Sequence, residues 1–263
     1  MFRSPQTRGQ HSVLTLSSPK SAFLGDAEFP KSAERLVKGG RIRLYEFVYK
    51  QYSTLAFSLM TDRSVAISGL EKRLIRTFNT TGGYGVFTEY LDRSLLWQRA
   101  SNEMNRIQYP AWRKVPSWSW MAYDGRITYV DIPFGKVDWL HQVQSPFERD
   151  ATNNQSEVVD IYANTPPIDL SAIAWNLSPH SAGSELTSVV FDQHGMKTLP
   201  GLKCVVVAKD RYPGPGELRK LYVLVIAPRT LDGFDQTFER VGAGFVEEGQ
   251  IDFRGPRSFV NIQ

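Results

Sequence analysis

The segment Val115-Pro116-Ser117-Trp118-Ser119-Trp120 lies where the apolar pattern of the chain changes its period. Before it, apolar residues recur at every third or fourth position, a spacing that is typical of helices packed on a core. From Trp118 onward, apolar residues alternate with polar ones, a spacing that is typical of strands. The sequence therefore predicts a helical first part and a β-rich second part, which meet near Pro110.

Three helices are predicted before this point. The first begins at Arg41, and its apolar face is formed by Ile42, Tyr45, Tyr49 and Tyr52. The second begins at Asp62, a residue type that caps helix N-termini, and Gly82 and Gly83 end it. Its expected buried stripe is Ala66, Leu70, Leu74 and Phe78, and its expected solvated basic residues are Arg63, Lys72, Arg73 and Arg76. The third runs from about Thr88 to Ser101 and carries Leu91, Leu95, Leu96 and Trp97.

The second part is predicted to be antiparallel β-structure. A hairpin is expected in which the strand of Trp118 and Trp120 turns at Asp124-Gly125 into the strand that carries Ile127 and Tyr129. Further strands are expected at 157–163, 168–177, 203–208, 221–227 and 237–246. The strand Leu221–Ile226 is apolar on both faces, so it should be central, and the Asp232-Gly233 turn should lead into its partner.

These segments predict an α+β fold, in which an N-terminal helical section packs on a largely antiparallel β-sheet or sandwich. The helical section is placed at 33–109 and the β-rich section at 110–263, as one continuous domain. Residues 1–32 are predicted to be a disordered tail. A transit peptide is the less favoured interpretation, because Pro5, Gly9 and Pro19 would break its amphipathic helix.

The composition limits the functional classes. The chain has 263 residues with a net charge of +4, and its basic residues are scattered among acidic ones, which favours solubility over nucleic-acid binding. Cys204 is the single cysteine, so no intramolecular disulfide can form, and a reducing compartment is expected. No apolar run approaches the ~20 residues that a membrane helix needs. We therefore expect a cytoplasmic protein that binds neither nucleic acid nor membrane.

The residues with chemical potential are dispersed along the chain. His11, His141, His180 and His194 lack the spacing of zinc ligands, and Cys204 lies in an apolar strand. The carboxylates Asp124, Asp131, Asp138 and Asp192 form no sequence pair for acid-base chemistry, and the glycines at 82–85 follow a helix and lack a P-loop lysine. The sequence thus predicts no catalytic residue, no cofactor and no metal.

Two interpretations of Trp118 and Trp120 follow from their spacing. Side chains two positions apart in a strand share a face, so the rings could form an exposed platform on which a sugar or base stacks. Core packing against the helices is favoured, because aromatic rings bury large apolar areas.

Three sets of residues together resemble the region that follows the HET domain in fungal heterokaryon-incompatibility proteins. The first is Tyr52-Ser53 with Thr61-Asp62-Arg63-Ser64-Val65-Ala66-Ile67-Ser68-Gly69-Leu70. The second joins Tyr84-Gly85-Val86-Phe87 and Leu95-Leu96-Trp97 to Val115-Pro116-Ser117-Trp118-Ser119-Trp120. The third is Leu221-Tyr222-Val223-Leu224-Val225 with Phe238-Glu239-Arg240-Val241-Gly242-Ala243-Gly244.

The resemblance covers about Tyr45 to Val246 and omits the motifs of the HET domain itself. It implies a non-catalytic accessory or regulatory module of the nonself-recognition and programmed-cell-death type. The implied partners are proteins, among them a HET effector supplied by another chain. The signature residues, expected to be structural, are Asp62, Gly69, Pro116, Trp118, Trp120, Asp124, Gly125, Arg240 and Gly242.

Besides a hydrolase, which is the more distant interpretation, two alternatives remain open from the sequence. The first is a ligand-binding, carbohydrate-type β-sandwich that uses Trp118 and Trp120. The second is the product of a truncated or decayed gene whose fold persists without a selected role.

Overall fold

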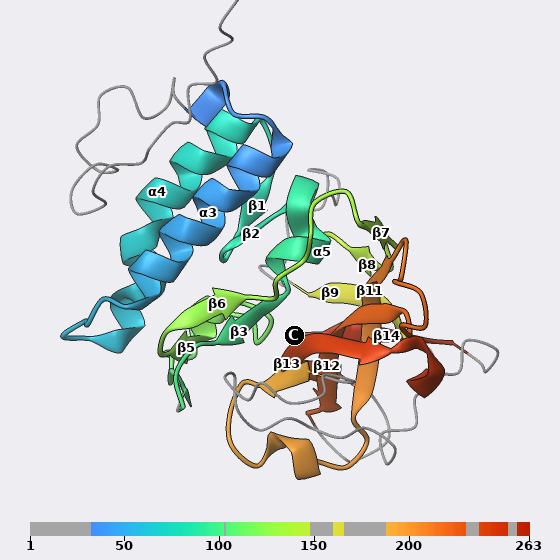
Figure 1. The fold of residues 1–263 in the computed structure, drawn as a ribbon. Coiled ribbons are helices and arrows are strands. Elements are labelled where there is room, and N and C mark those ends of the chain that lie inside the picture. Colours follow the sequence, from blue (N-terminus) through green and yellow to red (C-terminus); the bar gives the residue numbers. More distant parts are fainter. Residues whose placement is uncertain (1–32, 103, 148–159, 166–187, 230–236, 252–256) are drawn as a thin grey trace, which may run out of the picture.

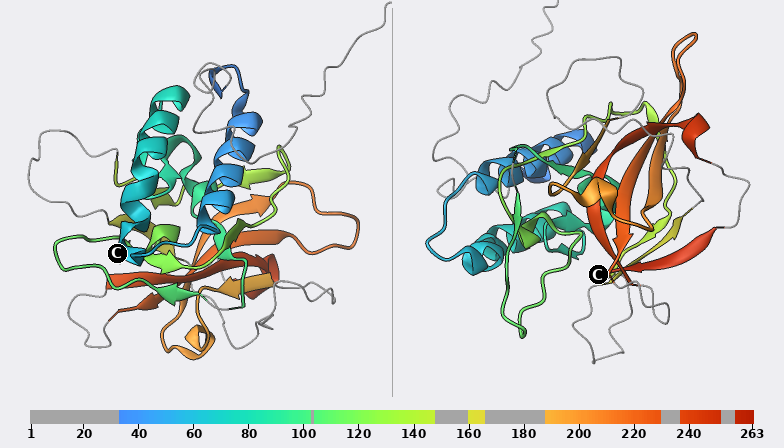
Figure 2. Two further views of the ribbon diagram at one scale, coloured as in Figure 1. Left: turned by 90° about the vertical axis from the view of Figure 1, so that its left-hand side faces the viewer. Right: turned by 90° about the horizontal axis from the view of Figure 1, so that it is seen from below.

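The computed structural model describes residues 33–102, 104–147, 160–165, 188–229, 237–251 and 257–263. The predicted tail at 1–32, the predicted strand at 168–177 and the Asp232-Gly233 turn lie outside these residues. Two long helices form one layer and a curved sheet forms another, with short strands between them (Figure 1). Figure 2 shows both helices on the same side of the sheet. The predicted α+β class is confirmed.

The first long helix, α3 (Lys38–Ser53), has the predicted apolar face. Ile42, Tyr45 and Tyr49 are buried, and Tyr52 is half-buried. The ring of Tyr45 lies among those of Phe87, Tyr90 and Tyr129, with centroid separations of 5.2, 5.8 and 6.0 Å. The spacing of aromatic residues therefore gave both the helix and its buried side.

The second long helix, α4 (Arg63–Phe78), follows the 3-10 turn η1 (Met60–Asp62), but its buried face differs from the prediction. The buried residues are Arg63, Ile67, Glu71, Leu74 and Phe78, whereas Ala66 is exposed and Leu70 half-buried. The predicted stripe is correct at Leu74 and Phe78 and wrong at its other two residues. The buried face turns toward two charged side chains, Arg63 and Glu71, which the prediction left outside. The helix ends at Asn79, which is left-handed with φ 53°, and not at the glycines.

The third predicted helix was also wrong. Residues 88–99 form η2 (Thr88–Tyr90), the one-turn helix α5 (Leu91–Ser94) and the strand β3 (Trp97–Arg99). Every residue from Tyr90 to Trp97 is buried, so the leucines do not mark one helical face. Gly82–Gly83 (β1) pairs with Val86–Phe87 (β2) in a small hairpin before this segment.

The hairpin predicted at the two tryptophans does not form. Residues 117–119 make a turn that leads into η3 (Trp120–Ala122). Tyr123–Asp124 (β5) then pairs with Asn105–Arg106 (β4), and Ile127–Tyr129 (β6) pairs with β3. The strands on either side of Gly125 therefore pair with other segments and not with each other.

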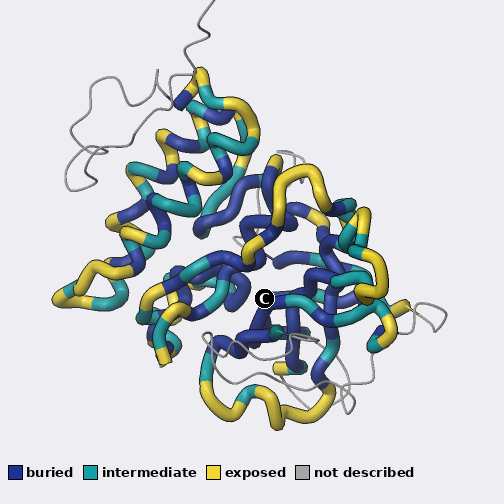
Figure 3. The backbone as a smooth tube through the Cα atoms, viewed as in Figure 1, coloured by how far each residue is buried: buried dark blue, intermediate teal, exposed yellow. Residues whose placement is uncertain are grey.

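The large sheet contains the remaining strands. They are β7 (Val137–Trp139), β8 (Val143–Gln144), β9 (Ile161–Thr165), β10 (Ser188–Phe191), β11 (Lys203–Asp210), β12 (Lys220–Pro228), β13 (Thr237–Glu247) and β14 (Ser258–Ile262). The order is β7-β11-β12-β13-β14-β9-β8, and β10 also pairs with β13. The pairs are antiparallel except β13 with β14. As predicted, β12 is central and buried on both faces (Figure 3).

The interior is divided into three apolar clusters. One lies between the sheet and α5, one lies within the helical part, and one lies on the other face of the sheet around Val206, Val223 and Val225. Trp118 belongs to the first cluster and Trp120 to the second. Because they lie in a turn, the two rings point into different cores, which corrects the prediction that they share a face.

Candidate functional site

The signature residue Arg240 lies in the interior at the centre of a polar network. Its Nη2 is 3.1 Å from Oδ1 of Asp192, and both side chains are completely buried. Its Nη1 donates to the carbonyl of Leu95 at 3.0 Å, and its Nη2 also donates to the carbonyl of Trp97. Burial raises the pKa of Asp192 and lowers that of Arg240, while their mutual attraction opposes both shifts. The pair joins β13 to β3 and to the end of β10.

An irregularity in β13 directly follows Arg240. The register of β13 on β12 shifts between the pairs Ile226–Arg240 and Val225–Gly242, so Val241 is an extra residue. A bulge of this kind changes the face to which the next side chain points. At Gly242, an added Cβ would lie 2.9 Å from the carbonyl oxygen of Val190 in β10. The glycine therefore permits β10 to approach.

The Pro116–Trp120 segment is bonded to the same network. The Ser117 hydroxyl accepts from the Arg240 amide at 3.0 Å and donates to the Gln263 carbonyl. The Trp97 indole Nε1 donates to the Trp118 carbonyl at 2.9 Å. Trp118 and Trp120 are fully buried, so neither ring offers a face to a sugar. The carbohydrate platform proposed for these two rings is therefore excluded.

Trp120 contacts a second buried arginine. The Arg63 guanidinium carbon lies 5.3 Å from the Trp120 ring centroid, and Nη2 donates to the carbonyls of Gly125 at 2.9 Å and Ser53 at 3.4 Å. The prediction that Arg63 is solvated was wrong, because the side chain is completely buried and its Nη2 donates to two backbone carbonyls from distant segments. Gly125, with φ 144°, is thus one of its acceptors and not part of a hairpin turn.

The remaining signature residues have smaller roles. Asp62 occupies the N-cap position of α4, but its side chain makes no capping hydrogen bond. Nothing lies within 4 Å of a Cβ added at Gly69, so the structure does not explain a glycine there. Pro116 accepts from the Ser119 amide at 3.0 Å, and Asp124 pairs with Asn105 in the β4–β5 ladder. The signature residues that lie in the interior therefore stabilise the fold, whereas the described contacts give no such role to the side chain of Asp62 or to Gly69.

The other predicted chemistries can be placed in part. Cys204 is completely buried, and burial raises the pKa of its thiol to about 12, so it is a core residue as expected. His11 and His180 lie outside the described residues. Within the described ranges, no three His, Cys, Asp or Glu side chains gather into a metal site, and no helix is long and apolar enough to cross a bilayer.

Asp92 and His141 form a pair that the sequence analysis missed. Oδ2 of Asp92, in α5, is 3.3 Å from Nδ1 of His141, which follows β7 and has a left-handed φ of 49°. The two residues are 49 positions apart in the sequence, so no short-range spacing predicts their contact. They line a cavity of about 460 Å³ between the start of α3, α5 and the β7–β8 edge, which we call the Asp92 cavity.

A second hollow of about 370 Å³ lies under residues 107–116, which we call the Trp112 loop. Its basic lining residues are Arg106, Arg113, Lys114 and Arg229. Trp112 itself is 72% exposed at the surface. Among the lining residues, Asp160 is the acidic one, and it accepts hydrogen bonds from Asn261 and Gln263. The hollow therefore has a positive character.

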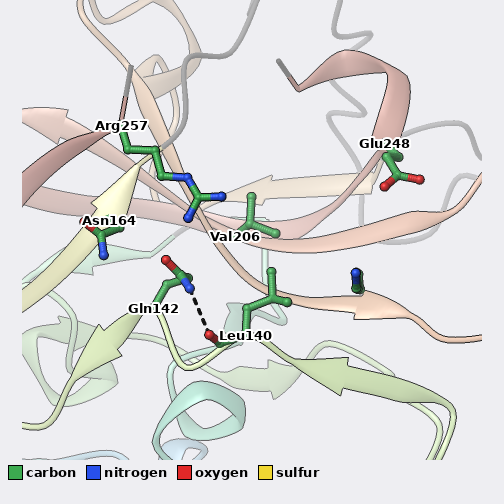
Figure 4. A pocket seen from close by; sticks show the side chains of 7 residues that line it. Leu140, Gln142, Asn164, Val206, Glu248 and Arg257 are labelled. Carbon is green, nitrogen blue, oxygen red and sulfur yellow. Dashed lines mark hydrogen bonds between the residues drawn. The ribbon is translucent and has the colours of Figure 1, made fainter. Parts of the chain in front are cut away.

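A third, smaller hollow of about 190 Å³ lies on the sheet beside β9 and β11 (Figure 4). Leu140 and Val206 form its apolar floor, and Glu248 and Arg257 lie on opposite sides. Gln142 donates to the Leu140 carbonyl at 2.9 Å.

No family model matches the chain, and no curated protein or solved structure is similar enough to be a match.

Proposed function

We propose that the chain is a non-catalytic, cytoplasmic accessory module of the heterokaryon-incompatibility type, which acts by binding a HET effector carried by another chain. The resemblance of its motifs supports this proposal. The roles of the matching residues agree with it, because Ser117, Trp118, Trp120 and Arg240 join the helical part to the sheet in the interior. Buried residues of this kind would be shared by modules that have the same fold but differ in their surface residues.

The Trp112 loop is the surface that carries the proposal of protein contact. Exposed tryptophan and arginine dominate the energetics of protein interfaces, especially where the loop is held rigidly before binding. Here the Arg113 guanidinium carbon lies 4.6 Å from the Trp112 ring centroid, and its Nη1 donates to the Thr61 carbonyl at 2.7 Å. The Tyr109 hydroxyl donates to the Met121 carbonyl at 2.8 Å. Hydrogen bonds from residues on both sides of Trp112 therefore hold the loop in place.

Charge indicates the chemistry of the partner. Arg113, Lys114 and Arg229 surround the hollow beside Trp112, and the acid that lines it is engaged by amides. A partner surface with carboxylates around an apolar pocket would complement this face. The effector's contact surface is thus proposed to be acidic.

The test is co-expression in a fungal host with a separate HET-domain protein, with cell viability and co-purification as readouts. Wild type should co-purify with the effector and change viability. Trp112→Ala and Lys114→Glu should each weaken co-purification about tenfold or more. The matched control is Tyr212→Ala, which removes another ring that is 75% exposed in the β11–β12 connection. Equal binding by Trp112→Ala and Tyr212→Ala would refute the assigned surface, and cell death caused by this chain alone would refute the accessory role.

A further inference from the structure

Asp92 is a buried acid on the wall of a cavity, with half of its hydrogen-bonding capacity unused. The residue is 8% exposed. Its Oδ2 is 3.3 Å from His141, whereas Oδ1 is closed to solvent and has no hydrogen-bond partner among the residues that the structure describes. Burial raises the pKa of Asp92 to about 6, although His141 opposes the shift. A carboxylate in such surroundings gains from any cation with N–H donors that reaches it.

The cations already present neutralise Asp92 poorly. His141 is 84% exposed in its side chain, so water screens the interaction of its imidazole with Asp92. Arg93 directs Nε to Glu46 at 2.9 Å and Nη1 to the Ile132 carbonyl at 3.0 Å. Lys38 lies with Nζ 5.6 Å from the Tyr90 ring centroid. Glu89, exposed at the rim, adds a second negative charge to the lining.

The walls of the Asp92 cavity are aromatic. Tyr90, Phe134 and Trp139 all line it. Aromatic faces attract cations within about 6 Å of the ring centroid, most strongly where water is excluded. Two of these rings already have a cation beside them. The guanidinium of Arg93 lies 4.6 Å from the Phe134 centroid, and Lys38 lies near the Tyr90 ring. The cavity thus combines a buried acid with surfaces that accept both a cation and an apolar group.

We propose that the Asp92 cavity binds an organic ammonium ion, whose N–H groups donate to Oδ2 of Asp92 and whose apolar portion lies against Tyr90 and Trp139. The cavity volume of about 460 Å³ falls within the ~300–1,000 Å³ of small-molecule sites. This site is separate from the Trp112 loop. Its occupancy does not depend on the proposed accessory function, and either proposal can fail without the other.

The decisive comparison uses the full chain and two probes of nearly the same shape. Phenethylamine is protonated at neutral pH, and 2-phenylethanol replaces its ammonium by a hydroxyl. Calorimetry and thermal shift should show that the amine binds about tenfold or more tightly than the alcohol, because only the amine compensates the buried carboxylate. Equal affinities, or no binding of the amine, would overturn the proposal, and neither outcome requires a variant.

Two variants locate the site. Asp92→Asn should abolish the preference for the amine, whereas Asp138→Asn should keep it. Asp138 is a suitable control because it lies in the neighbouring strand β7 but is bonded to Arg211 at 2.8 Å, away from the cavity lining. An amine preference that survives in Asp92→Asn would place the ligand elsewhere.

The ammonium could come from a free amine or from a lysine of a partner protein. Nα-acetyl-lysine amide, used as a third probe, separates these sources. Tighter binding of phenethylamine would assign a free amine, and tighter binding of the lysine derivative would assign a peptide lysine. Failure of Asp92→Asn to weaken either probe would contradict both assignments.

Discussion

The guanidinium carbon of Arg240 lies 3.3 Å from the centroid of the Trp97 ring, and both side chains are completely buried. The same guanidinium pairs with Asp192, so one side chain holds together β13, β3 and the segment that follows β10. Because burial of a charge is costly, this arrangement persists only while every member of the network is present. Arg240 thus connects the helical part to the sheet through buried hydrogen bonds and an ion pair.

Replacing Arg240 with methionine should destabilise the protein by about 3–5 kcal/mol, because Asp192 would remain buried without its cation. The double variant Arg240→Met with Asp192→Asn should recover part of this loss. Urea unfolding measures both. The control is Arg211→Met, which breaks an exposed pair with Asp138 and should cost about 0–1 kcal/mol. Equal losses in Arg240→Met and Arg211→Met would contradict the role of the network.

Gly85→Ala should destabilise the protein by about 2–4 kcal/mol. Gly85 has φ +84°, and an added Cβ would lie 2.2 Å from Nε1 of the buried Trp120. Gly135→Ala is a matched control, because Gly135 has φ +73° and no atom within 4 Å of an added Cβ. The control should lose only about 1–2 kcal/mol from backbone strain. Thermal unfolding that shows the same loss for both would mean that Trp120 moves aside freely.

The spacing of apolar residues predicted the elements that are buried on one face, such as α3, or on both faces, such as β12. The aromatic spacing of α3 and the continuous apolar run of β12 each permit a single interpretation. The Ser-Trp-Ser-Trp alternation permits two, because a turn between two cores also needs large apolar residues separated by small polar ones. Which one forms is decided by the Ser117 and Trp97 hydrogen bonds to distant segments, and no local pattern encodes these.

The candidate site was less predictable than the fold. Asp92 lies in a segment whose leucines suggested a longer helix, and its partner His141 comes from another part of the chain. Arg63 looked like one of four solvated basic residues, because its acceptors at Ser53 and Gly125 are backbone carbonyls, which any sequence supplies. The partners of a buried charge come from segments that tertiary structure brings together, so a single sequence does not reveal them.

Arg63→Ala should cost about 2–4 kcal/mol, since it removes two buried hydrogen bonds, a contact with Trp120 and much packing. Arg73→Ala, on the exposed face of the same helix, should change stability by no more than about 0.5 kcal/mol. Both substitutions place a good helix former in α4, so helix propensity does not explain a difference. Chemical unfolding that gave similar values for the two would show that Arg63 is not held as described.

Glu71 should make the protein less stable as the pH rises, which is opposite to the effect of a carboxylate in a salt bridge. It is buried in α4, where Oε1 accepts from the Gly85 amide at 2.6 Å, and desolvation raises its pKa from 4.5 to about 7. A raised native pKa means that the folded protein binds the proton more tightly than the unfolded chain. The stabilisation is therefore complete below about pH 4.5 and is lost as the pH rises to about 7.

The Glu71→Gln variant keeps an oxygen acceptor for Gly85 and removes the titration. Its free energy of unfolding relative to wild type should increase between pH 5 and pH 8 by up to about 3 kcal/mol. Because Asp92 and Asp192 titrate in both proteins, the difference between the two curves isolates Glu71. Urea unfolding at several pH values measures it. A constant difference across this range would mean that the Glu71 carboxyl is ionised in the folded protein at pH 5 as it is at pH 8, and that the backbone amides of Gly85 and Tyr84 stabilise its charge.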